Sequence, residues 1–163
     1  MHRWYKALMI SLIVLGSIFI RESYTYGLEY YYLNNKTENK EAVINLNDEE
    51  IMLLSKLVAA EARGESYEGQ VAVAAVVLNR VQDSRFPDSI EGVIYQKNAF
   101  SVVRNGYIKA ERTEESDKAV KDALYGNDPT NNAIYFWNPD ISTCNWINTL
   151  NPHLRIGNHV FAR

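Results

Sequence analysis

A glutamate at the end of an amphipathic helical pattern is the residue with the clearest chemical potential in this chain. Residues 48–62 carry apolar side chains three and four positions apart, and Glu61 continues this series after Leu57 and Val58. A carboxyl group on that face is partly desolvated, which favours its protonated form. Such an acid is suited to protonate a leaving-group oxygen. The alternative is a glutamate near a helix end that bends back into water.

A second carboxylate, Glu65, follows four positions later. Gly64 is expected to end the helix between the two, because glycine commonly follows a helix C-terminus. Glu65 should then lie at a turn and be more exposed. Two neighbouring carboxylates could form the acid and nucleophile of a glycoside-cleaving pair, but helical spacing does not establish the separation that this mechanism requires.

Composition excludes several classes of protein. The chain has 163 residues, 47% apolar and 23% charged, which is typical of a globular domain with an appendage. A net charge of −3 gives no sign of a nucleic-acid partner. The single cysteine, Cys144, excludes an internal disulfide framework and is expected to be a small packed residue. With only His153 and His159 in the domain and no HExxH motif, no metal site and no cofactor are predicted.

The N-terminal segment, residues 1–22, is predicted to be a signal peptide or membrane anchor. Basic residues precede an uncharged apolar run over residues 7–20, which fits a signal-peptide core and is short for a membrane span. No small-x-small cleavage site follows, so an uncleaved anchor is favoured over a cleaved signal. Residues 23–46 are predicted to be a polar tether. The domain at 47–163 would then lie outside the cytoplasm, held to the membrane or secreted to the wall.

The domain is predicted to have α+β architecture. Asn47 and Glu50 have the spacing of a capping box for the first helix. Ser66 should cap a second helix whose centre is apolar nearly all round, so other elements must surround it. The remaining expected elements are a short helix at 90–95 capped by Asp88, a hairpin turning at Asn105-Gly106, a helix opened by Thr113 and ended by Gly126, a strand at 133–137, and a hairpin at Gly157-Asn158.

Four ordered blocks of sequence resemble the cell wall hydrolases of the SleB/CwlJ family, the spore cortex-lytic enzyme type. The blocks are EARGESYEGQVAVAAVVLNRV, FPDSIEGVIYQKNAFSVV, DPTNNAIYFWNP and IGNHVFA. The resemblance implies a lysozyme-like fold related to lytic transglycosylases and action on the glycan strands of peptidoglycan. It places the family's catalytic glutamate, the first of the EARGE block, on Glu61. Trp137 and Asn132 depart from residues common in relatives.

The resemblance also implies a mechanism. Glu61 would protonate the oxygen between N-acetylmuramic acid and N-acetylglucosamine, and the muramoyl 6-hydroxyl would attack to give a 1,6-anhydro product. Hydrolysis assisted by Glu65 is the close alternative. Longer spore enzymes of this type carry a peptidoglycan-binding module, whereas an anchor is expected here, so a general wall-processing role stays open. The rival classes are a zinc amidase and a non-catalytic wall-binding module.

Further residues are predicted to bind substrate, because aromatic faces pack against sugar rings and polar groups bind hydroxyls. They are Glu65, Gln70, Phe100, Ser101, Tyr135, Phe136, Trp137 and His159. Structural alternatives remain for several: a core strand for the aromatic residues, a cap contact for Gln70, and a hydrogen-bonded structural role for His159. Trp146 is expected in the core. No pattern identifies a protein partner.

Overall fold

The computed structural model describes residues 41–163, so the predicted anchor (1–22) and most of the predicted tether (23–46) lie outside the described residues. Within residues 41–163, none of the helices combines the length and apolar character that a membrane crossing requires. These residues form one compact unit with four α-helices and two small antiparallel sheets. The α+β prediction is therefore confirmed.

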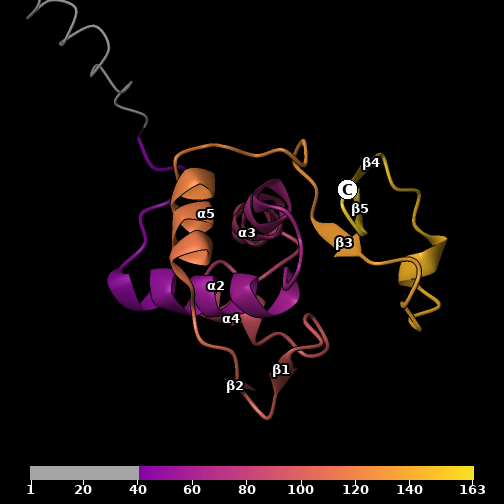
Figure 1. Ribbon diagram of the computed structural model, residues 1–163, viewed down its shortest axis with the longest axis horizontal. Helices are drawn as coiled ribbons and strands as arrows, with labels where there is room; N and C mark the ends of the chain where they lie inside the picture. Colours follow the sequence, from indigo (N-terminus) through magenta and orange to yellow (C-terminus); the bar gives the residue numbers. More distant parts are fainter. Residues whose placement is uncertain (1–40) are drawn as a thin grey trace, which may run out of the picture. The chain divides into compact units, whose positions relative to one another are not determined.

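Helix α3 (Tyr67–Gln82) is the centre of the domain. It contacts α2 (Asp48–Glu61), α4 (Ile90–Ile94) and α5 (Glu114–Leu124). Figure 1 shows α3 nearly end-on, with α5 upright beside it and α2 lying across the view below them. Every residue from Gly69 to Leu78 is buried. The apolar centre predicted from sequence is therefore enclosed on all sides.

Helix caps follow local sequence, with one correction. The Asn47 side chain accepts from the Glu50 amide, and the Glu50 side chain accepts from the Asn47 amide, each at 3.0 Å, which is the expected capping box. Ser66 and Thr113 cap α3 and α5 as predicted. For α4, however, the cap is Ser89 rather than Asp88, because the Ser89 hydroxyl is the group that accepts from the amide three residues on.

Two hairpins form where the asparagine-glycine and glycine-asparagine turns predicted them. Strand β1 (Val103–Arg104) pairs with β2 (Tyr107–Ile108). Strand β4 (Leu154–Ile156) pairs with β5 (His159–Ala162), and β5 also pairs with β3 (Tyr135–Trp137), so the sheet order is β3-β5-β4. The β3 pairing is shorter than the predicted strand at 133–137. A 3-10 turn, η1 (Ile147–Thr149), lies in the loop before β4.

Helix α3 joins the helical half to the three-stranded sheet. Its residues Ala72 and Val76 pack with Ala133, Ile156 and Phe161 in a cluster separate from the main helical core. In Figure 1 the strands β3, β4 and β5 lie on the side of α3 away from α5. One buried helix thus fixes the position of the sheet relative to the end of α2, where Glu61 lies.

Candidate active site

Glu61 is the last residue of α2, and its carboxyl group is largely withdrawn from water. Its Oε1 accepts a hydrogen bond from the Val102 amide at 3.3 Å. Burial raises the pKa of Glu61, while hydrogen bonds from Val102 and Ser101 and the charge of Arg80 oppose that rise. The carboxyl group also lies at the negative end of the α2 dipole, which disfavours its ionised form. The predicted desolvation of Glu61 is confirmed.

Arg80 is a site residue that the sequence reasoning missed. Its side chain is only 5% exposed, and its Nε donates to the Ile134 carbonyl at 2.7 Å. The guanidinium carbon lies 5.2 Å from the Phe86 ring centroid, 5.0 Å from that of Phe100 and 5.8 Å from that of Tyr135. Burial lowers the pKa of Arg80 to about 10, so it stays cationic at neutral pH. The sequence gives little signal for it, because Arg80 is one of several polar residues at the end of α3, with Asn79 and Gln82.

Glu65 does not lie exposed at its turn, so this expectation was wrong. Its side chain is 6% exposed, because the turn of the β4–β5 hairpin covers it. Its carboxylate accepts from the Asn158 amide at 3.1 Å and from the Asn158 side chain at 2.9 Å. His159 Nδ1 lies 3.8 Å from the same carboxylate. These contacts join the α2–α3 turn to the hairpin.

The predicted aromatic residues of β3 point in different directions. Phe136 packs between Phe100 and Phe161, with ring centroids 6.3 Å and 6.2 Å away. Trp137 is buried in a separate cluster with Val160 and Ala162. Tyr135 is half-buried beside Arg80, as described above. Of the three rings, Tyr135 is the one that lies over the Arg80 guanidinium.

Trp146 extends the aromatic surface, contrary to the expectation that it lies in the core. It is 56% exposed and meets Tyr135 edge-to-face, with centroids 5.3 Å apart. The core expectation failed because the loop from Asn138 to Thr149 has too few apolar neighbours to enclose an indole. Cys144, in the same loop, is exposed rather than packed.

The remaining predicted residues lie at varied distances from Glu61. Ser101 is next to it, since its hydroxyl and amide both act to lower the pKa of the Glu61 carboxyl. Gln70 instead donates to Glu115 at 2.8 Å, which links α3 to α5. His159 is buried, and its ring meets Phe136 edge-on at 5.2 Å. Burial lowers the pKa of His159 against the opposing charge of Glu65, so it is neutral at pH 7.

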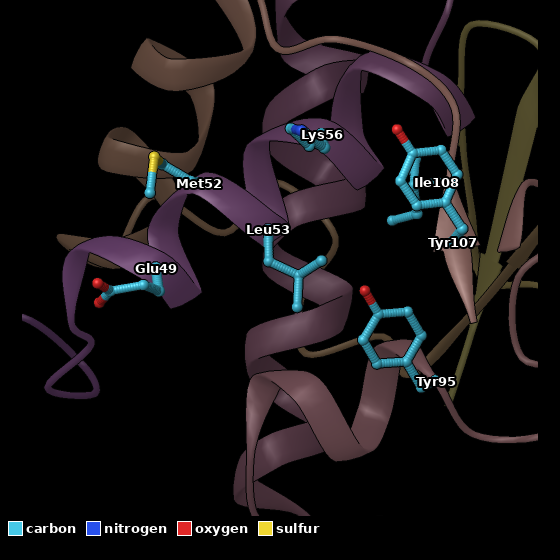
Figure 2. Close-up of a pocket in the computed structure, with 7 residues that line it drawn as sticks. All are labelled: Glu49, Met52, Leu53, Lys56, Tyr95, Tyr107 and Ile108. Carbon is cyan, nitrogen blue, oxygen red and sulfur yellow. The ribbon is translucent and has the colours of Figure 1, made fainter.

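A separate open pocket lies along the first three turns of α2. It encloses about 260 Å³, and its lining residues are Glu49, Met52, Leu53, Lys56, Tyr95, Tyr107 and Ile108. Figure 2 shows Leu53 in its middle, with Met52 and Glu49 on one side and the two tyrosines on the other. It contains neither Glu61 nor Arg80. The chemistry therefore favours the end of α2, where a desolvated acid and a buried cation occur together.

No group of three or more metal-ligating side chains is gathered anywhere in residues 41–163. His153, one of the two histidines of the domain, has its Nε2 2.9 Å from the Thr130 carbonyl oxygen. The groups that this part of the chain brings together are thus an acid, a guanidinium and aromatic rings.

The family model for Cell Wall Hydrolase matches residues 64–162, and the chain belongs to this family. The match begins just after Glu61, so the assignment does not depend on that residue.

Individual relatives agree with this assignment. The chain is 47% identical over 114 residues to a spore cortex-lytic enzyme of Oceanobacillus iheyensis, covering 70% of this chain and 41% of that protein. It is 46% identical over 129 residues to a spore cortex-lytic enzyme of Bacillus cereus, covering 79% and 49%. The chain thus spans less than half the length of these curated relatives.

Solved structures match nearly end to end. The catalytic domain of the Bacillus cereus SleB protein superposes with a TM-score of 0.68 at 42% identity, covering 79% of this chain and all of that one. The catalytic domain of the germination-specific lytic transglycosylase SleB from Bacillus anthracis gives 0.69 at 44% identity, covering 73% and 98%. The expected fold, an α+β lysozyme-like domain, is confirmed.

Proposed function

We propose that this chain cleaves the glycan strands of peptidoglycan between N-acetylmuramic acid and N-acetylglucosamine, as a lytic transglycosylase. The observation that carries the proposal is Glu61, at the end of α2, a carboxyl group whose pKa is raised by burial. The match to SleB catalytic domains over almost their whole length supports it.

The reaction needs one group that first gives and then takes a proton. Glu61 donates its proton to the bridging oxygen, the bond from that oxygen to the muramoyl C1 breaks, and positive charge develops at C1. The muramoyl 6-hydroxyl then bonds to C1 and returns its proton to Glu61. The products are a 1,6-anhydro-muramoyl end and a free N-acetylglucosamine hydroxyl, without consumption of water.

The surroundings of Glu65 favour this route over hydrolysis with a second carboxylate. Asn158 occupies both carboxylate oxygens of Glu65, and the hairpin covers the side chain. A nucleophile or water-activating base must be free to reach the reacting carbon. Glu65 is therefore assigned a structural role, and Glu61 acts alone.

The exposed aromatic surface gives the sugar chain a place to bind. Tyr135 and Trp146 form an edge-to-face pair next to Arg80, and Trp146 is open to solvent. Apolar ring faces with polar tips suit the faces and hydroxyls of sugars. We assign these two residues to substrate binding, with Ser101 beside the acid.

Mass analysis of digested peptidoglycan tests the proposal. The full chain is incubated with purified peptidoglycan, and the soluble products are weighed. Transglycosylation predicts muramoyl products lighter by one water than hydrolysis products, and Glu61→Gln should release neither. Equal release by wild type and Glu61→Gln would refute the assignment of the acid. Water-containing products would show hydrolysis instead.

The predicted setting is outside the cytoplasm at the wall or spore cortex, through the anchor at residues 1–22. This part of the proposal rests on sequence alone, since those residues lie outside the described ones. Cell fractionation with and without residues 1–22 tests it. Loss of the protein from the membrane fraction on deletion is the expected result, and unchanged distribution would refute membrane anchoring.

A further inference from the structure

Arg80 is a buried cation without a carboxylate partner. None of the ion pairs formed within residues 41–163 includes it. A buried charge that lacks a close counter-ion is costly, and proteins seldom retain one without compensation. Three aromatic rings and one backbone carbonyl provide that compensation here.

The arrangement leaves most of the guanidinium donors available to the site. Nε is used by the Ile134 carbonyl. Within residues 41–163, the two Nη atoms of Arg80 make no hydrogen bond, and neither atom is completely buried. Because a guanidinium has five N–H donors, four have no hydrogen-bond partner within residues 41–163.

The positive charge of Arg80 acts on the carboxyl group of Glu61. The segment from Phe100 to Val102 contacts both residues, since the Phe100 ring lies 5.0 Å from the Arg80 guanidinium carbon and the Val102 amide donates to Glu61 at 3.3 Å. The Arg80 charge favours the ionised form of Glu61 and lowers its pKa against the effect of burial. The other polar groups acting on Glu61 are the Ser101 hydroxyl and the amides of Ser101 and Val102. The Tyr135 phenol faces Arg80 from β3, and Glu65 is occupied by Asn158 and His159.

We propose that Arg80 is a positioning residue of the site, whose fixed cation steadies the Glu61 carboxylate between delivery of its proton and its recovery. The assignment rests on the proposed function, and it goes beyond it by naming the group that balances the acid. The aromatic rings around Arg80 hold the guanidinium in place, so the charge need not reorganise when the carboxylate forms. No ion pair within residues 41–163 joins Arg80 to Glu61, so the acid is not held permanently ionised.

The first measurement is an NMR titration of the Glu61 side-chain carbon in the full chain. Charge removal in Arg80→Met and Arg80→Gln should raise the Glu61 midpoint by about half a pH unit to one unit. Arg80→Lys keeps the charge and should leave the midpoint close to that of wild type. Because this readout needs no substrate, it separates failure of the inference from failure of the proposed function.

The second measurement is the pH profile of kcat on peptidoglycan. The charge-free variants should lose about ten- to a hundredfold in kcat with little change in KM, and their alkaline limb should move to higher pH. Arg80→Lys should recover most of kcat. A purely structural role would lower thermal stability without moving the limb.

Either of two results overturns the inference. One is an unchanged Glu61 midpoint in a folded charge-free variant. The other result concerns Arg80→Lys and is used if neither charge-free variant folds. If the Glu61 midpoint in Arg80→Lys then differs from that of wild type by about half a pH unit or more, the role of Arg80 does not depend on its charge and the inference is refuted.

Discussion

At the scale of single residues, the features that suit Glu61 to acid catalysis also lower the stability of the folded protein. Burial and its position at the C-terminal end of α2 both disfavour the carboxylate. Acid catalysis requires this arrangement, because an acid with an ordinary pKa would have lost its proton near neutral pH. The folded protein is therefore less stable with Glu61 ionised than with Glu61 neutral.

Glu61→Gln should stabilise the protein at neutral pH. The folded pKa of Glu61 is raised above its unfolded value, so its contribution to stability is present at low pH and is lost as pH rises from the unfolded pKa through the folded one. At pH 7 the amide avoids this loss and should add about 1 kcal/mol to the free energy of unfolding. Urea unfolding at pH 7 and pH 4 measures it, and the gain should shrink at pH 4.

Glu49→Gln is the matched control for this measurement. Glu49 is exposed in the first turn of the same helix, where the dipole favours a carboxylate. It should bring no gain at either pH. A gain at Glu61 that is equal at pH 7 and pH 4 would contradict the desolvation argument.

At the scale of elements, the β4–β5 hairpin is fastened to the α2–α3 turn at one point. Gly157 has φ +58°, and the Glu65 carboxylate lies where a side chain at this position would begin. Only glycine combines that backbone conformation with so close an approach. The Glu65–Asn158 contacts depend on this space.

Gly157→Ala should therefore destabilise the domain by about 2–4 kcal/mol, through backbone strain and displacement of Glu65. Gly106→Ala is the control, because Gly106 also has a positive φ of +72° but faces open space. Its cost should be about 1–2 kcal/mol, from backbone strain alone. Thermal unfolding compares the two, and equal losses would show that the Glu65 contact adds nothing.

The pairing of α3 with α5 offers a second test at this scale. The Tyr67 hydroxyl donates to Asp122 at 2.6 Å, and burial and this hydrogen bond raise the pKa of Tyr67 to about 12. Tyr67→Phe should cost about 1 kcal/mol in the free energy of unfolding, since one carboxylate hydrogen bond is lost.

The exposed Tyr125, at the end of α5, supplies the comparison. Tyr125→Phe should change the free energy of unfolding by less than about 0.5 kcal/mol. Chemical denaturation at pH 7 distinguishes the two variants. A Tyr67→Phe variant as stable as Tyr125→Phe would mean that the hydrogen bond contributes no net stability.

At the scale of the whole domain, the site exists because α3 supports both halves. Arg80 reaches Ile134 before β3, and Asn79 donates to the Ala133 carbonyl at 3.0 Å. These contacts hold the segment that leads into β3 against the C-terminal part of α3, with Tyr135 next to Arg80. Substrate binding is thus expected from the sheet side, and proton transfer from the helical side.

Trp146→Ala tests whether the sheet side binds substrate without taking part in proton transfer. Loss of the indole should raise KM for soluble glycan fragments about tenfold, with kcat and thermal stability nearly unchanged, because the side chain is exposed. Ile141→Ala, in the same loop and 76% exposed, should change neither constant. Equal effects of the two substitutions, or an unchanged KM in Trp146→Ala, would remove Trp146 from the site.

The sequence by itself determined the helices, most of their caps, both hairpins and the apolar helix face on which Glu61 lies. These features depend on residues within one or two turns of each other, so periodicity and turn chemistry encode them directly. The Asp88 cap failed because Ser89 competed with it one residue away, a choice that similar local propensities leave undecided.

Only the tertiary structure decided the partners of Glu65, Arg80 and Trp146. Glu65 meets Asn158 across 93 positions of sequence, and Arg80 meets Ile134 across 54. Burial of a carboxylate or arginine depends on which distant segment covers it, and the exposure of Trp146 depends on the absence of such cover. No local pattern specifies these packing outcomes, because they follow from how the three-stranded sheet and three helices pack around α3.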